Sequence, residues 1–232
     1  MLDMLKIMDW SPLFISLKTA TFATIISFFI GLFAAVQVMK AKPRTKAIVD
    51  GILTLPMVLP PTVIGYMLLL LFSLKRPVGS FLYEHYHLKV VQTWLGCVIA
   101  AVVVSFPLMY RSARGAFEQV DMNINYAGQT LGMSNKKIFW KVIMPSARPG
   151  IISGAILTFA RALGEYGATS MLAGNIVGKT STISQVIAMV MKDGDYLKAG
   201  IWVIIIMIFA FAIIGIMNLI SEKKNINQKR WK

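Results

Sequence analysis

Long apolar stretches, separated by short polar segments, dominate the chain. A helix that crosses a bilayer needs about 20 consecutive, mostly apolar residues. Five stretches meet this requirement, at about residues 11–39, 47–74, 93–110, 149–172 and 199–220. The pattern predicts an all-α integral membrane protein with five transmembrane helices, forming a single domain over residues 1–232.

A sixth apolar run, at residues 182–191, is too short to cross a membrane. We expect a short helix there that either lies on the membrane surface or re-enters from one side. The sequence does not decide between the two arrangements.

Composition supports a membrane protein. The chain is 56% hydrophobic and 15% charged, with a formal net charge of +14, whereas soluble domains carry about 25% charged residues. A strongly basic protein often binds nucleic acid, but the long uncharged stretches leave no basic face for it. The single cysteine, Cys97, excludes a disulfide scaffold.

The basic residues predict the orientation. Loops that face the cytoplasm carry an excess of Lys and Arg. Residues 40–46, the loop at 111–148 and the tail after residue 220 hold the larger share of them, and the other connecting segments are nearly neutral. The N-terminus is therefore expected outside and the C-terminus in the cytoplasm.

Prolines interrupt the second stretch. Pro56, Pro60 and Pro61 remove backbone donors and break a helix. Broken helices within a membrane are tolerated where they face protein or water, and they often form transport sites. We interpret Pro60, Pro61 and Thr62 as lining a translocation path, although a purely structural kink remains an alternative. Ser105, two residues before Pro107 in the third stretch, is a weaker candidate of the same kind.

The fourth stretch carries two charges, Arg161 and Glu165, in its apolar run. Their spacing allows an ion pair on one helix face, and charges at this depth are costly and commonly functional. We interpret the pair as part of a path or gate, with a self-satisfied structural pair as the alternative. Small residues at four-residue spacing predict close helix packing: Gly150, Gly154, Ala160, Gly164 and Ala168.

The 111–148 loop predicts two short helices. Phe117, Val120 and Ile124 recur at helical spacing, Gly132 makes a turn, and Ser134 begins a second helix that ends at Pro145 and Pro149. A basic helix–turn–helix also resembles a DNA-binding motif. Because membrane spans tether this loop at both ends, a docking surface for a soluble partner is the better interpretation.

Other motifs are weak. Residues 173–180 fit a relaxed phosphate-binding loop, but such loops follow a buried strand. His85 and His87 lie near Glu84, a sparse set for a metal. With no catalytic constellation, we expect a chain without enzymatic activity, metal site or bound cofactor.

The loop resembles the coupling motif of importer-type ABC transporter permeases. The matching positions are Tyr126, Ala127, Gly128, Gly132, Val142, Met144 and Pro145, with Tyr126, Gly128 and Met144 departing from the family's Glu, Ala and Leu. The resemblance implies a type I importer fold in which this loop, including Ser134, docks on a cytoplasmic ATPase.

Two further stretches, 55–66 and 159–169, are similar to molybdate permeases, with sulfate/thiosulfate permeases as near relatives. That similarity implies a molybdate or tungstate importer in a prokaryotic cell membrane. It also implies a homodimer of this chain, a dimer of the ATPase carrying ATP and Mg, and an external oxyanion-binding protein. A stand-alone secondary transporter is the alternative class, but it would need its own coupling-ion site and usually internal repeats.

Overall fold

A computed structural model describes residues 8–229, which contain helices and no strand. Four helical stretches are long and apolar enough to cross a membrane, and a bent helix pair adds a fifth if it counts as one span. This agrees with the five predicted spans. The predicted single domain also includes residues 1–7 and 230–232, which lie outside the described residues. The helices are α2 (Ser11–Lys40), α3 (Pro43–Val58), α4 (Pro61–Phe72), α5 (Pro77–Tyr86), α6 (Trp94–Glu118), α7 (Met122–Thr130), α8 (Asn135–Ile138), η1 (Phe139–Ile143), α9 (Met144–Leu163), α10 (Gly167–Ala173), α11 (Ile183–Lys192) and α12 (Tyr196–Lys229).

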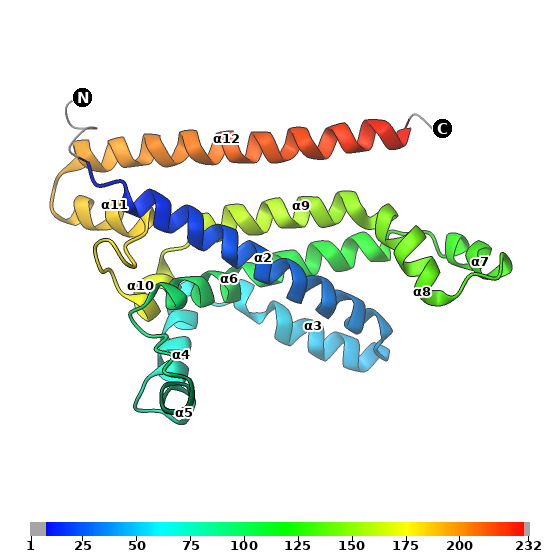
Figure 1. Ribbon diagram of the computed structural model, residues 1–232, viewed down its shortest axis with the longest axis horizontal. Helices are drawn as coiled ribbons and strands as arrows, with labels where there is room; N and C mark the ends of the chain where they lie inside the picture. Colours follow the sequence, from blue (N-terminus) through cyan, green and yellow to red (C-terminus); the bar gives the residue numbers. More distant parts are fainter. Residues whose placement is uncertain (1–7, 230–232) are drawn as a thin grey trace.

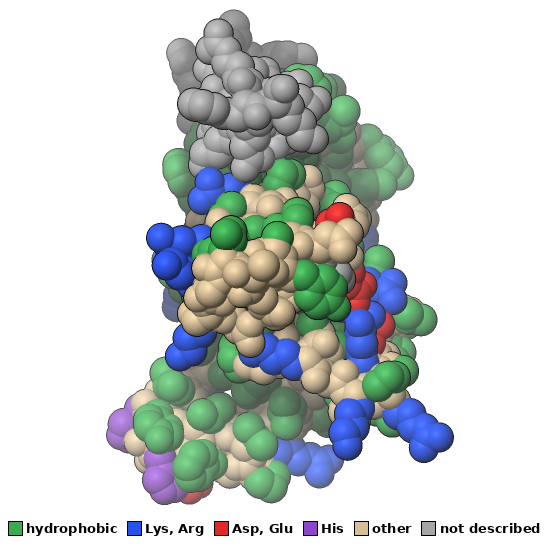
Figure 2. All heavy atoms as spheres, turned by 90° about the vertical axis from the view of Figure 1, so that its right-hand side faces the viewer, with side chains coloured by type: hydrophobic (Ala, Val, Ile, Leu, Met, Phe, Trp, Pro, Cys, Tyr) green, Lys and Arg blue, Asp and Glu red, His purple; other side chains and the backbone are tan. Residues whose placement is uncertain are grey.

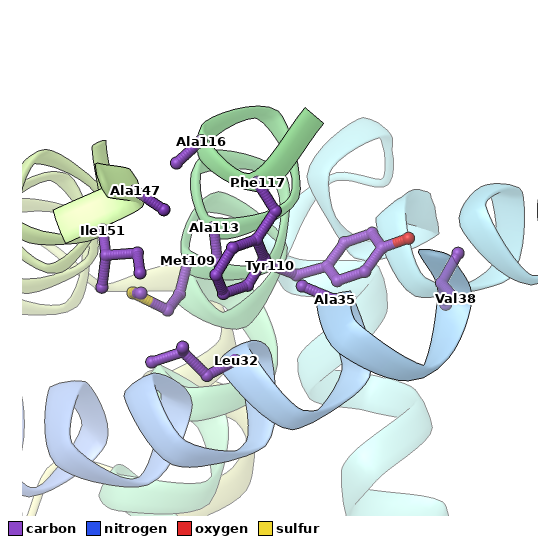
Figure 3. Packing of buried hydrophobic residues seen from close by; sticks show 10 residues of the cluster. All are labelled: Leu32, Ala35, Val38, Met109, Tyr110, Ala113, Ala116, Phe117, Ala147 and Ile151. Carbon is purple, nitrogen blue, oxygen red and sulfur yellow. The ribbon is translucent and has the colours of Figure 1, made fainter. Parts of the chain in front are cut away.

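Helices α2, α6 and α9 form the centre of the molecule, with α12 along one side and α3 along the other (Figure 1). The largest buried cluster joins these three central helices (Figure 3). Alanines make up much of it, which allows the helix backbones to approach closely. Its members are Leu32, Ala35, Val38, Met109, Tyr110, Ala113, Ala116, Phe117, Ala147 and Ile151.

The predicted glycine pair on α9 packs against α6. A Cβ atom on Gly150 would lie 2.6 Å from the Ala116 Cβ, and one on Gly154 would lie 2.5 Å from the Ser112 Cβ. Neither position can hold a larger side chain without moving the helices apart. The prediction of close packing from these two glycines is therefore confirmed.

The second predicted span is sharply bent. Helices α3 and α4 meet at an angle of 108° around Leu59 and Pro60. As a result, α4 and α5 project from the side of the bundle (Figure 1). The proline break was predicted, but the size of the bend was not. Pro56 is tolerated inside α3, and only the Pro60–Pro61 pair interrupts the helix.

The third span is longer than predicted. Helix α6 continues from Trp94 to Glu118 and so takes in the first residues of the expected 111–148 loop. The prediction that Phe117 shares a loop helix with Ile124 was wrong. Phe117 is buried in the core at the end of α6, and Ile124 lies on α7.

Pro145 and Pro149 do not end a helix, contrary to prediction. The chain is helical without interruption from Asn135 to Leu163. Residues 139–143 form a π-helix just before Pro145, so Pro145, which has no N–H to donate, lies where the regular hydrogen bonding of the helix is already interrupted. Locally widened hydrogen bonding of this kind accommodates an irregularity inside a helix.

The fourth predicted span is also broken. Helix α9 ends at Leu163, and α10 begins at Gly167. The expected continuous helix over residues 149–172, with one unbroken stripe of small residues, was therefore wrong beyond Gly164. The last span, α12, begins at Tyr196 rather than near residue 199 and continues past residue 220.

The short apolar run forms helix α11, as expected. At its start the Thr182 N–H donates to Gln185 Oε1 at 3.0 Å, and the Ile183 N–H donates to Ser16 Oγ at 2.9 Å. The preceding segment, residues 173–180, follows helix α10 rather than a strand, and the Gln185 side chain holds it through the Gly174 carbonyl. It is a turn and not a phosphate-binding loop.

Candidate functional site

The two helix breaks meet. One lies between α3 and α4 at Pro60, and the other between α9 and α10 at residues 164–166. Helices α4 and α10 pack so closely that a Cβ atom on Gly167 would lie 3.0 Å from the Pro61 Cβ. A Cβ atom on Gly65 would lie 2.7 Å from the Ala168 Cα. The structure thus brings together irregular backbone from segments about 100 residues apart in the sequence.

Arg161 and Glu165 form the predicted ion pair at this crossing. Arg161 Nη1 lies 2.7 Å from Glu165 Oε2. Glu165 lies beyond the end of α9, so the pair does not share one helix face as expected. The other carboxylate oxygen of Glu165 accepts a 2.8 Å bond from the Ala168 N–H and caps the first turn of α10. One carboxylate therefore joins the two sides of the break.

Burial distinguishes the two partners. Glu165 is 3% exposed, whereas the Arg161 side chain is 34% exposed. Glu165 holds one guanidinium nitrogen, and about a third of the Arg161 side chain remains exposed. Arg161 can therefore present hydrogen-bond donors to an anion while its buried partner holds it in place.

The other predicted path residues divide into two groups. Pro60 and Thr62 are exposed and Pro61 is half-buried, all beside the crossing. Ser105 lies fully buried in α6, and its hydroxyl has no hydrogen-bond partner among the described residues. The structure brings Pro61 to the second break but leaves Ser105 inside the helix bundle.

The predicted coupling residues fall on or next to a helical hairpin made by α7 and by α8, which continues into η1. Gly132 connects the two helices with a φ of 71°, a left-handed conformation that favours glycine. Ser134 caps α8 by accepting a bond from the Lys137 N–H, as predicted. Ile138 is fully buried against Gly128, where a Cβ atom would lie 2.9 Å from its side chain. The hairpin therefore has its own small core.

Two exposed apolar side chains of this hairpin were not predicted from the sequence. Leu131 is 80% exposed and Trp140 is 65% exposed, and they share the hairpin with the exposed Tyr126 and Ala127. Large apolar groups in a polar loop were the signal that could have identified them. Figure 2 looks onto this end of the molecule, where Lys and Arg are the prominent charged side chains.

The last three predicted coupling residues lie at the base of the hairpin. Val142 belongs to the π-helix, and Met144 and Pro145 begin α9. All three are half-buried. Their position connects the hairpin to the central helix α9.

A charged cluster that was not predicted from the sequence lies between α3 and α6. Asp50 accepts a 2.9 Å bond from the Tyr110 hydroxyl and a hydrogen bond from Arg114. Glu118 pairs with Arg114 at 3.0 Å and with Lys46 at 2.6 Å. Because the partners on α3 and α6 are 60 or more residues apart, sequence spacing alone could not reveal the cluster.

Known proteins resemble the chain along most of its length. Residues 27–224 match the family described as "Binding-protein-dependent transport system inner membrane component". The chain is 38% identical over 215 residues to the molybdenum transport system permease protein ModB of Escherichia coli K12, covering 92% of each protein. It is 36% identical to the putative molybdenum transport system permease protein YvgM of Bacillus subtilis 168, covering 93% of each. The sulfate transport system permease protein CysT of Salmonella typhimurium is 31% identical, over 90% of this chain and 75% of CysT.

Solved structures show the same fold. The inward-facing MetNI methionine ABC transporter superposes with a TM-score of 0.72 at 16% identity, covering 91% of this chain and 94% of that one. A bacterial ABC transporter that imports alginate superposes with a TM-score of 0.77 at 13% identity, covering 92% and 78%. The architecture is that of type I ABC importer transmembrane domains. The chain therefore belongs to the binding-protein-dependent transport system inner membrane component family, as a multi-pass protein of the prokaryotic plasma membrane.

Proposed function

We propose that this chain is the permease subunit of an ATP-driven importer for molybdate or tungstate. The observation that carries the proposal is the ranking of its relatives. Molybdenum permeases are 36–38% identical over nearly the whole chain, whereas the sulfate permeases are 30–34% identical. Sulfate or thiosulfate import is the second candidate, because the sulfate permeases also align over 90% of the chain.

The bent face of α3 and α4 supports a homodimer. Helix α3 has no buried residue, and exposed apolar side chains such as Ile48, Ile52 and Val58 lie along it. Lipid could cover those side chains, but Pro60 and Thr62 are exposed at the same bend. Irregular backbone inside a membrane must face protein or water. A second copy of the chain, with a path between the two copies, satisfies that requirement.

Arg161 supports an anion as the transported species. Its guanidinium is the charged group at the crossing of the two helix breaks that remains accessible, because Glu165 is buried. An oxyanion such as molybdate offers several acceptor oxygens to such a group. Pro60, Pro61, Thr62, Arg161 and Glu165 would then form the path or gate, with Ser105 behind it in the bundle.

The hairpin of α7 and α8 would dock on a cytoplasmic ATPase. Leu131 and Trp140 are large apolar groups exposed on a polar hairpin. Exposed groups of this type are commonly the central contacts of an interface. ATP and Mg would bind to that partner, while an external binding protein would deliver the oxyanion. This chain would contribute the path and no chemical step.

Uptake by a reconstituted complex tests the proposal. The chain, its ATPase and its binding protein are placed in proteoliposomes, and ATP-driven uptake of labelled molybdate is measured against excess tungstate or sulfate. We expect tungstate to compete strongly and sulfate weakly. Efficient competition by sulfate alone would support the sulfate alternative. Uptake without ATP would indicate a secondary transporter instead.

A further inference from the structure

Helix α3 contacts the bundle through one carboxylate and two apolar side chains. Of its residues, Val49 and Leu53 are partly buried against the main cluster, and none is fully buried. Asp50, between them, is the one acidic residue in α3. Its carboxylate accepts hydrogen bonds from the Tyr110 hydroxyl and from Arg114, and Arg111 lies 3.9 Å away. A single carboxylate thus faces three donors from α6.

A second set of contacts lies one turn further along both helices. Lys46 precedes Asp50 by one turn of α3, and Glu118 follows Arg114 by one turn of α6. Lys46 pairs with Glu118 at 2.6 Å, and Glu118 pairs with Arg114 at 3.0 Å. Alternating charges on two neighbouring helices fix their register, because a shift by one turn would place like charges together.

Tyr110 connects this cluster to the core. Its side chain is fully buried among the apolar side chains of α2, α6 and α9. Figure 3 shows its hydroxyl directed away from Met109 and Ile151, and that hydroxyl donates to Asp50 at 2.9 Å. The side chains of Asp50 and Arg114 are themselves only 22% and 20% exposed. The cluster is therefore held on a rigid support and partly shielded from solvent.

The cluster also lies between the two functional regions. Helix α6 ends at Glu118, and α7 of the hairpin begins at Met122. Helix α3 ends at Val58, next to the break at Pro60. A displacement of the hairpin that tilts the end of α6 would be passed to α3 through Asp50, and from α3 to the bend.

We propose that Asp50 is a positioning residue that clamps α3 to the last two turns of α6, so that movement of the α7–α8 hairpin reaches the helix break at Pro60. The inference rests on the proposed coupling role of the hairpin. Without the Asp50 charge, α3 keeps its partial apolar contacts and the Lys46–Glu118 pair, and movement of the end of α6 reaches the bend less completely. ATP hydrolysis then continues while less oxyanion is transported per ATP.

Asp50→Asn tests the clamp, because asparagine keeps the shape and an acceptor for Tyr110 but loses the charge. Asp193→Asn, at an exposed position between α11 and α12, is the matched control. Both complexes are reconstituted, and three quantities are measured: the ATPase bound per permease, ATP hydrolysed, and oxyanion transported per ATP. Arg114→Gln and the double variant complete a mutant cycle.

The proposal predicts that Asp50→Asn binds the ATPase normally but transports about fivefold less oxyanion per ATP, the size of effect that a partly shielded ion pair carries. The double variant should be no worse than either single variant. Spin labels at Ile48 and Gln119, in a Cys97→Ala background, should report a broader α3–α6 distance distribution. Where Asp50→Asn does not accumulate in membranes, Arg114→Gln replaces it, because it removes the other member of the Asp50–Arg114 pair and should lower transport per ATP in the same way.

Transport per ATP equal to that of Asp193→Asn would overturn the clamp. Loss of ATPase binding in Asp50→Asn would also overturn it, because Asp50 would then act in assembly. Failure of the proposed function looks different: the wild-type and Asp193→Asn complexes would themselves lack ATP-driven uptake. The two ideas can therefore be rejected separately.

Discussion

Gly167, the first residue of α10, lies directly against Pro61, the first residue of α4. A Cβ atom on Gly167 would lie 3.0 Å from the Pro61 Cβ and 3.2 Å from the Thr62 backbone nitrogen. Two helices that each begin after a break therefore start at the same point in the molecule. A change in the angle of one helix must move the other as well, because packed backbones leave no room for independent movement.

Replacement of Gly167 by leucine should separate the two breaks. We expect a loss of about 1–3 kcal/mol of stability, the usual cost of overpacking, together with a large loss of uptake. Thermal unfolding in detergent and uptake in proteoliposomes measure the two effects. Gly200→Leu is the control, because a side chain there meets no atom within 4 Å. Wild-type uptake in Gly167→Leu would show that the contact has no role in transport.

Arg161→Ala should abolish uptake while the complex still assembles. It leaves Glu165, which is 3% exposed, with only the Ala168 N–H as a partner. Removal of one member of a buried pair costs about 3–5 kcal/mol, and the partial exposure of Arg161 should keep the loss near the lower end. Complex assembly is checked by size-exclusion chromatography and uptake by labelled oxyanion.

Arg161→Lys separates charge from geometry. Lysine restores a positive charge near Glu165 but cannot donate two parallel bonds to an oxyanion. We expect stability close to that of the wild type with uptake still reduced. If Arg161→Ala transports normally, the pair serves only to join α9 to α10.

The prolines at the first break provide a test of bending. Pro60→Ala combined with Pro61→Ala restores two backbone donors, so α3 and α4 can approach a continuous helix. We expect altered uptake kinetics and a straighter bend, measured with spin labels on α3 and α4. Pro56→Ala is the matched control, because Pro56 lies inside α3 without ending it. Equal kinetics in both variants would assign the prolines to packing.

The two breaks differ in how far the sequence could predict them. Consecutive prolines mark the first break by backbone chemistry alone, so Pro60 and Pro61 were identified correctly. The second break contains no proline, and the spacing of Arg161 and Glu165 suited a continuous helix. It forms because the Glu165 carboxylate caps α10 three residues further on and because α10 packs on α4. The packing on α4 is a tertiary contact, which leaves no local pattern.

The length of α6 was underestimated for a related reason. Arg111 and Arg114 resembled loop residues, because an unpaired charge inside a membrane is costly. Asp50 and Glu118 pair with Arg114, and Asp50 comes from a helix earlier in the chain. Similarly, Ser134 and Gly132 were predicted from local turn chemistry, whereas the exposure of Leu131 and Trp140 depends on how the hairpin folds.

Leu131 and Trp140 give the most direct test of the docking surface. Truncating both to alanine should weaken binding of the ATPase about 30-fold or more, because a central aromatic anchor such as Trp140 commonly contributes about 2 kcal/mol. The fold should survive, since both side chains are largely exposed and the hairpin core is formed by Ile138 against Gly128. Affinity is measured by titrating detergent-solubilised permease with the ATPase.

Tyr196→Ala, an equally exposed aromatic at the start of α12, is the control and should bind normally. Normal binding by the double variant would mean that the ATPase docks elsewhere, and equal loss in Tyr196→Ala would mean that the effect is not specific to the hairpin.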